Sequence, residues 1–469
     1  MADSDSSSPR VEYGSRGGVN GEERKMEPPR DPYNMVYIIF YWLGMGSLLP
    51  WNFFISVTGY WMYKFRDVTD VEPHHHASNF TRAHGNETNP LSPLQLKWNS
   101  YLSIAAVIPN VIFVLLNAIL GHRFRTQPRI MFAIVTIMIT FIFTDALTVV
   151  DTDPWQHEFL ILTLIMVVII NIMVAIFQGG LAGLAAQFPP EYMGSVCQGQ
   201  ALGGIFASGT NVLTLVLGSN GEESALWCFL VTIIFLGTSF AAFIVLTRTA
   251  FFKFYVKDGP QSESDESTPL ITPDHMDVRE ATTRVCVIHV FKQIWVWTLA
   301  VFLSFAATLS VFPAVTALTL STGYNDGGRW STEYFIPVTC FVFFNVGDYV
   351  GRILAGVVQW PKATQSGSWS VMCMSLARMA FIPLFLFCNA SPSNRVYTPV
   401  LFHSDIAFIV LVILFSISNG YVGNIAMMYA PKVLTDSQSQ STAASIMVSA
   451  LVIGLGCGSL MSTVWVALL

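Results

Sequence analysis

The sequence predicts an all-α polytopic membrane protein, and two features of its composition lead to this prediction. Of the 469 residues, 53% are apolar and only 12% are charged, whereas a soluble chain carries about 25% charged residues. The charges also gather in a few places. Residues 1–31 hold 12 of the 54, and segments 64–97, 121–130 and 248–292 hold 24 more. The apolar stretches between them are long enough to cross a hydrocarbon core of about 30 Å.

Eleven apolar windows have the length of a transmembrane helix, which is about 20 residues. The weakest is the third, because it carries Asp145. An odd number of spans places the two termini on opposite sides of the membrane. The windows cover residues 35–57, 98–120, 130–150, 159–184, 195–218, 225–247, 293–320, 334–359, 369–389, 406–428 and 442–468.

The order of windows and charged segments predicts four regions. A leader over residues 1–34 is rich in Ser, Gly, Pro and charge, which is typical of disorder. Spans one to six form an N-terminal bundle over 35–247, and spans seven to eleven form a C-terminal bundle over 291–469. Between them, residues 248–290 form a cytoplasmic linker with an acidic, Ser-rich stretch.

The distribution of Lys and Arg predicts a cytoplasmic N-terminus and a C-terminus on the opposite side. With this orientation, cytoplasmic segments hold 16 Lys and Arg and the opposite side holds 6, in agreement with the positive-inside rule. The sequons at Asn79 and Asn86 then fall in the first outer loop, where glycosylation occurs. The two criteria are independent and agree.

Polar side chains inside apolar spans are the candidate functional residues, because ionisable groups in a membrane are costly and usually serve a purpose. Asp348 and Arg352 are four residues apart, so they share one helix face, and Asn345 lies on the same face. One interpretation is a pair that only neutralises itself. The other is a site for substrate hydroxyls, since a carboxylate accepts hydrogen bonds and a guanidinium donates them.

The first and fourth spans carry further candidates. Pro50 interrupts the helical hydrogen bonding of the first span, next to Trp51 and Asn52. Trp51 either lies in an interfacial aromatic belt or offers a surface on which a ring can stack. Gln178 in the fourth span either makes an interhelical hydrogen bond or presents its amide to a ligand.

Other classes of protein lack support in the sequence. There is no Walker loop, GxSxG, HExxH or dinucleotide fingerprint, and the seven Cys show no metal-binding or disulfide spacing. We therefore expect neither an enzyme nor a cofactor, metal or nucleic-acid partner.

Several span motifs resemble those of the equilibrative nucleoside transporters. LLPWNFF at 48–54 is similar to the signature of their first span, and FNVGDYVGR at 344–352 to that of their eighth. SNGY at 418–421, followed by Pro431, resembles the tenth span. The pairs QG at 178–179 and 198–199 and FPAV at 312–315 fit the fourth, fifth and seventh spans. The first span looks most like the pH-responsive endolysosomal branch.

This resemblance implies a fold of the major facilitator type, with six spans plus five around a central cavity. It implies facilitated transport of purine and pyrimidine nucleosides, and it leaves open whether nucleobases also pass. Trp51 and Gln178 would contact the nucleobase, and Asp348 and Arg352 the ribose. The resemblance also implies cavity-lining residues and a gate; these are Leu48, Asn52, Asn345, Phe341 and Leu451 for the lining, and Phe312 and Pro313 for the gate.

One departure from the family pattern concerns the size of the pocket. Gly347 stands where many members carry a bulky residue before the Asp, which predicts a roomier pocket. Alternatives within transport also stay open: a facilitator of another polar solute such as a sugar, a proton-coupled nucleoside transporter, or, with less support, a channel.

The linker contains an acidic dileucine pattern formed by Glu266, Leu270 and Ile271. Clathrin adaptors bind such patterns in the cytoplasm, so the segment is either a sorting signal or an ordinary solvated acidic linker that matches the pattern by chance. We expect a multi-pass protein of the plasma membrane, with the endolysosomal membrane as the alternative.

Overall fold

The computed structural model describes residues 30–66, 92–121, 124–217, 221–257, 274–324, 327–390 and 399–468. The predicted glycosylation sites Asn79 and Asn86 lie outside these ranges, as do the predicted sorting residues Glu266, Leu270 and Ile271.

The first half of the chain forms a group of long helices that we call the N-terminal bundle. Two short helices, α2 and α8, accompany it. Apolar composition favours these helices because a helix satisfies its own backbone groups in lipid, and a Ser92–Gln95 capping box starts α3. The members are α1 (Met35–Ser56), α2 (Thr58–Lys64), α3 (Pro93–Leu120), α4 (Thr126–Thr148), α5 (Gln156–Ala185), α6 (Pro190–Leu217), α7 (Gly221–Arg248) and α8 (Ala250–Lys257).

The second half forms a group of helices that we call the C-terminal bundle. Its third predicted span, residues 369–389, is broken between α11 and α12, and its second, residues 334–359, begins with two π-helical turns before α10. The members are α9 (Asp274–Val311), η7 (Trp330–Tyr334), η8 (Pro337–Val342), α10 (Phe343–Val358), α11 (Gln365–Arg378), α12 (Phe381–Leu386), α13 (Asp405–Tyr429) and α14 (Ser437–Leu468).

The helical, membrane-spanning fold class is confirmed. Among the described residues, nine helices are long and apolar enough to cross a membrane. The other two predicted windows coincide with α3 and α6, which are 28 residues each; α3 contributes a shorter apolar stretch over Ile104–Leu120. Each predicted window therefore falls on a helix, and the count of eleven spans stays a prediction.

Helical structure extends into the segment predicted as a linker. Helix α8 follows α7 almost directly, and α9 begins at Asp274 rather than near residue 291. Charged residues made this part of the sequence look like a loop. A helix end that leaves the membrane can carry such charges, because hydropathy locates the apolar stretch and not the end of the helix.

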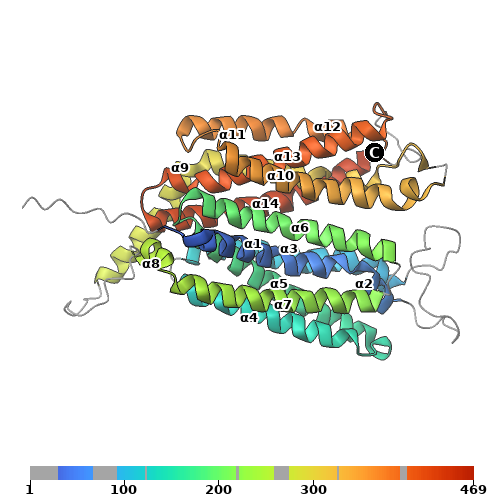
Figure 1. Cartoon of the computed structure of the whole chain (residues 1–469), viewed down its shortest axis with the longest axis horizontal. Helices are drawn as coiled ribbons and strands as arrows, with labels where there is room; N and C mark the ends of the chain where they lie inside the picture. The colour runs from blue at the N-terminus through green and yellow to red at the C-terminus, as the bar shows by residue number, and fades with distance from the viewer. Residues whose placement is uncertain are drawn as a thin grey trace, which may run out of the picture.

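The bundles lie side by side, with α6 between α1 and α10 (Figure 1). The start of α1 and the end of α14 lie at opposite ends of the molecule, and α8 lies at the end where α1 starts (Figure 1). This arrangement matches termini on opposite sides of a membrane. Large apolar side chains such as Ile108, Phe132 and Ile234 are exposed on the surface, as expected for a surface that faces lipid.

Several hydrogen bonds between described residues join the two bundles. They link the Tyr41 and Tyr349 hydroxyls (2.8 Å), Arg352 Nη1 and the Cys197 carbonyl (2.7 Å), Lys432 Nζ and the Ala186 carbonyl (3.0 Å), and Ser449 Oγ and the Val114 carbonyl (3.3 Å). Each lies toward the end of the bundles where α1 starts. The bundles are thus fastened to each other at that end.

Candidate functional site

Close packing of α10 against α13 brings several buried polar side chains together. A Cβ atom on Gly351 would lie 2.1 Å from the Ile417 carbonyl oxygen, and one on Gly420 would lie 1.9 Å from the Asp348 carbonyl oxygen. Only glycine fits at these contacts, since the neighbouring atoms are backbone. Small residues let helices in a membrane approach closely, and here they bring polar side chains of α10 and α13 within hydrogen-bonding distance.

Asp348 is the centre of this polar group. Its carboxylate accepts a hydrogen bond of 2.9 Å from Arg352 Nε and one of 2.6 Å from Asn419 Nδ2. Asp348 is 6% exposed and Asn419 is 3% exposed. The predicted Asp348–Arg352 pair therefore forms, and it has a third partner from α13.

Arg378 completes the group from α11. It is 2% exposed, and its guanidinium donates to Thr308 Oγ1 and the Phe415 carbonyl (both 2.8 Å), to Asn419 Oδ1 (3.1 Å) and to Ser418 Oγ. Asn419 thus bridges Arg378 to Asp348, so one carboxylate lies between two guanidinium groups. Because its Nη1 and Nη2 groups are hydrogen-bonded within the C-terminal bundle, Arg378 serves the structure of that bundle.

Arg352 differs from Arg378 because it faces the other bundle. Its Nη1 donates to the Cys197 carbonyl of α6, and 14% of its side chain is exposed. The guanidinium of the pair therefore lies at the boundary between the bundles. Its hydrogen bond to Cys197 can exist only while the two bundles are in contact at this point.

In the N-terminal bundle, three helices meet at Ser47 of α1. Gln178 of α5 donates to the Ser47 carbonyl (3.3 Å), and Gln200 of α6 donates to Ser47 Oγ (3.3 Å). Gln178 thus makes an interhelical hydrogen bond, one of the two roles considered for it. Its side chain is only half-buried, and an amide has further hydrogen-bonding capacity.

Trp51 and Asn52 follow Ser47 by about one turn of α1. The Trp51 ring is half-buried and lies nearly parallel to Phe54, with centroids 6.3 Å apart. Asn52 lies near α6, since a Cβ on Gly203 would be 3.8 Å from its Nδ2. Leu48 is half-buried on the same helix.

The predicted gate residue Phe312 lies at the end of α9 among aromatic rings of the eighth predicted span. Its ring stacks on Phe344 at 3.9 Å and meets Phe341 edge-on at 5.8 Å. Pro313 follows directly and is half-buried. The predicted gate residue Phe312 and lining residue Phe341 are therefore in contact.

The remaining candidates lie close to the boundary between bundles or in the core. Asn345 donates to the Phe341 carbonyl one turn earlier (2.9 Å), and its Oδ1 would be 2.4 Å from a Cβ on Gly204 of α6. Leu451 of α14 is half-buried against the main apolar core. No hydrogen bond between described residues joins Gln178 to Asp348 or Arg352, so these residues form two groups, one in each bundle.

Two features of the site differ from what the sequence suggested. Asn419 and Thr308 were not assigned roles, although a buried Asn in an apolar span is a signal of its own. Gly347 does not open a pocket: a Cβ there would lie 1.9 Å from Ser416 Oγ of α13, so its small size serves helix packing. Within the described ranges, no cluster of three His, Cys, Asp or Glu could hold a metal ion.

Comparison with known proteins places these features in a family. A family model described as "nucleoside transporter" matches residues 164–467. The chain is 31% identical to equilibrative nucleoside transporter 1 of Homo sapiens, covering 92% of this chain and 97% of the relative. It is 31% identical to equilibrative nucleoside transporter 2 of Homo sapiens, with coverage of 94% and 99%.

A third relative is equilibrative nucleoside transporter 3 of Rattus norvegicus, at 29% identity with coverage of 92% and 89%. The three identities are nearly equal and the printed names do not distinguish branches, so the resemblance to one branch of the family stays a prediction. The chain has the same fold as two solved structures. These are the fucose:proton symporter FucP of E. coli (TM-score 0.51, 10% identity, coverage 93% and 97%) and the proton:xylose symporter XylE (0.53, 10%, 91% and 87%). The second is described as a major facilitator superfamily protein, so that fold is confirmed.

Proposed function

Because the chain belongs to the equilibrative nucleoside transporter family, we propose that it carries purine and pyrimidine nucleosides across a membrane by alternating access. The observation that carries this proposal is the similarity to these transporters over nearly the whole chain. As a transporter, the protein is not an enzyme.

The polar groups of the two bundles suit the two parts of a nucleoside. A nucleobase needs a stacking surface and amide hydrogen bonds, which Trp51 and Gln178 of the N-terminal bundle supply. A ribose needs groups that accept and donate hydrogen bonds, which Asp348 and Arg352 of the C-terminal bundle supply. We propose that Leu48, Asn52, Asn345, Phe341 and Leu451 line the remaining cavity and that Phe312 and Pro313 form a gate.

The position of Arg352 suggests how binding is coupled to movement. Its hydrogen bond to Cys197 crosses between the bundles, and Tyr41 and Tyr349 make a second crossing nearby. Opening the molecule at this end requires these bonds to break. A substrate that contacts both bundles favours the closed arrangement, and its release allows the bundles to rock apart.

We also propose the sidedness and location of the protein. The N-terminus is cytoplasmic and the C-terminus is outside, with glycans on Asn79 and Asn86. The protein is placed in the plasma membrane, with the endolysosomal membrane as the alternative if adaptors bind the motif of Glu266, Leu270 and Ile271.

A competition experiment tests the proposed substrate class. Cells that express the chain take up labelled uridine, and unlabelled nucleosides or sugars are added in excess. We expect other nucleosides to abolish the carrier-dependent uptake and sugars to leave it unchanged. Equal inhibition by sugars would favour a facilitator of another polar solute, and uptake that rises with an inward proton gradient would favour proton coupling.

A further inference from the structure

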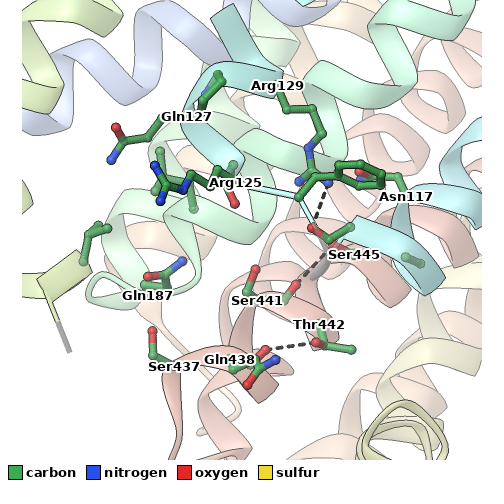
Figure 2. A pocket seen from close by; sticks show the side chains of 17 residues that line it. Asn117, Arg125, Gln127, Arg129, Gln187, Ser437, Gln438, Ser441, Thr442 and Ser445 are labelled. Atoms are coloured by element: carbon green, nitrogen blue, oxygen red, sulfur yellow. Dashed lines mark hydrogen bonds between the residues drawn. The ribbon is translucent and has the colours of Figure 1, made fainter. Parts of the chain in front are cut away.

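A polar cavity lies between the two bundles at the end proposed to be cytoplasmic, separate from the residues discussed above. It has a volume of about 290 Å³. The ends of α3 and α5 and the start of α4 contribute one wall, and the first turns of α14 contribute the other (Figure 2). The polar residues that line it are Asn117, Arg125, Thr126, Gln127, Arg129, Gln187, Ser437, Gln438, Ser441, Thr442 and Ser445.

The charge in this cavity is positive and uncompensated. None of the described lining residues is acidic, and neither Arg125 nor Arg129 forms an ion pair within the described part of the chain. Arg129 Nη1 donates to the Gly121 carbonyl (3.0 Å), but its Nε is buried without a partner. Figure 2 shows the two arginines across from the hydroxyl and amide side chains of α14. Such a set of donors suits an anion with several oxygen acceptors.

An apolar groove begins where the polar cavity ends. Its volume is about 540 Å³, and α3, α9 and α14 line it. Ala118 lines both spaces, and Ser445 of the cavity is followed directly by Ile446 of the groove. Trp295 and Leu299 of α9, which line the groove, are 43% and 38% exposed on the surface that faces lipid. The groove lies farther from the α14 start than the cavity does, and hence deeper in the membrane.

We propose that the cavity and the groove together bind one anionic phospholipid of the cytoplasmic leaflet. The phosphate and headgroup would occupy the cavity beside Arg125 and Arg129, and an acyl chain would occupy the groove. Basic pockets between transmembrane helices on the cytoplasmic side bind anionic headgroups, and this leaflet is rich in such lipids. The adjoining apolar groove distinguishes a lipid from a soluble phosphate compound, which would have no group to place there.

The proposed lipid would connect the bundles. Arg125 and Arg129 belong to the N-terminal bundle, whereas Ser441 and Thr442 belong to the C-terminal bundle. A headgroup that contacts both would stabilise the arrangement in which they are close at this end. The inference goes beyond the proposed function, and its test requires no transport, so the two can fail separately.

The test measures lipid binding to the purified full chain. Native mass spectrometry counts retained phosphatidylserine against phosphatidylcholine with the same acyl chains. We expect the wild type to retain phosphatidylserine preferentially, and Arg125→Gln/Arg129→Gln to weaken this binding by about 10- to 30-fold. Arg248→Gln is the matched control, since Arg248 is exposed at the same end and lines neither space; it should bind as the wild type does.

Two further arms keep the test decisive. If the double variant fails to fold, Arg125→Gln alone should still weaken binding, because Arg125 is exposed and substitution there leaves the core intact. Leu299→Trp fills the groove and should weaken lipid binding with the arginines unchanged. Equal retention of both lipids would overturn the proposal. So would displacement of the lipid by inorganic phosphate combined with no effect of Leu299→Trp, since that result indicates a soluble anion.

Discussion

At the residue scale, Arg352 and Arg378 are both near Asp348, yet their surroundings predict different effects of substitution: loss of transport for Arg352 and loss of folding for Arg378. Arg378→Ala removes the donor of four hydrogen bonds and a buried charge that faces Asp348 through Asn419. Hydrogen bonds to a charged group contribute about 1.5–3 kcal/mol each, so we expect little folded protein. Arg352→Ala leaves Asp348 with Asn419 and with the charge of Arg378 nearby, so folded protein should form but lose nucleoside uptake.

Surface abundance, thermal unfolding in detergent and uptake, measured on the same preparations, check this contrast. Arg352→Lys is a useful companion, since it keeps the charge but not the geometry of the guanidinium. Normal uptake by surface-expressed Arg352→Ala would remove Arg352 from the proposed site. Normal stability of Arg378→Ala would show that its network is dispensable.

Gln178 and Gln200 offer a second comparison at this scale, because both donate to Ser47. If Gln178 also contacts the nucleobase, Gln178→Ala should raise the half-saturating concentration of uridine by about 5- to 150-fold, as expected for hydrogen bonds lost in a desolvated site. Gln200→Ala serves as the control for loss of a Ser47 contact. Equal effects of the two substitutions would assign Gln178 to helix packing alone.

The sequence predicted some parts of the polar group and could not predict others. Asp348 and Arg352 are one turn apart, so helical periodicity alone places them together. The links from Asp348 to Asn419 and from Asn419 to Arg378 join α10, α13 and α11, and they depend on how these helices pack. Periodicity within one helix carries no information about which neighbour it meets.

At the element scale, the approach of α10 to α13 holds the site together and gives a prediction of its own. Gly351→Ala would put a methyl group 2.1 Å from the Ile417 carbonyl oxygen, so the helices must separate and the Asn419–Asp348 bond must lengthen. We expect a loss of about 1–3 kcal/mol in stability and reduced uptake. Thermal unfolding compared with Gly237→Ala, where nothing lies within 4 Å of the new atom, checks this. A variant Gly351→Ala as stable as that control would contradict the account.

Long apolar windows predicted the helices well, because the hydrocarbon thickness fixes their length. The misplaced features lie where other forces act. Helix α9 begins at Asp274, about four turns before its apolar stretch, and the break between α11 and α12 falls at Met379 and Ala380. Arg378 directly precedes that break and Pro383 follows it; Pro383 has no backbone N–H to donate to the Met379 carbonyl, a signal that hydropathy alone does not use.

At the scale of the whole molecule, the proposed sidedness is open to direct measurement. Asn79 and Asn86 should each carry a glycan when the chain is made in a eukaryotic cell, so Asn79→Gln and Asn86→Gln should each remove one glycosidase-sensitive mass increment. A tag within residues 258–273 should react with impermeant reagents only after permeabilisation. Labelling of that tag on intact cells would contradict the proposed topology. It would also place the lipid site in the opposite leaflet from the one proposed.

The central claim is that the chain is a carrier whose two bundles alternate around one nucleoside, and counterflow in proteoliposomes tests it most directly. Vesicles with the purified chain are loaded with unlabelled uridine and diluted into trace labelled uridine. A carrier returns with label as it exports unlabelled substrate, so labelled uridine should accumulate transiently above its equilibrium level, and Arg352→Ala should abolish this overshoot. A monotonic approach to equilibrium in the wild type would contradict alternating access and indicate a channel.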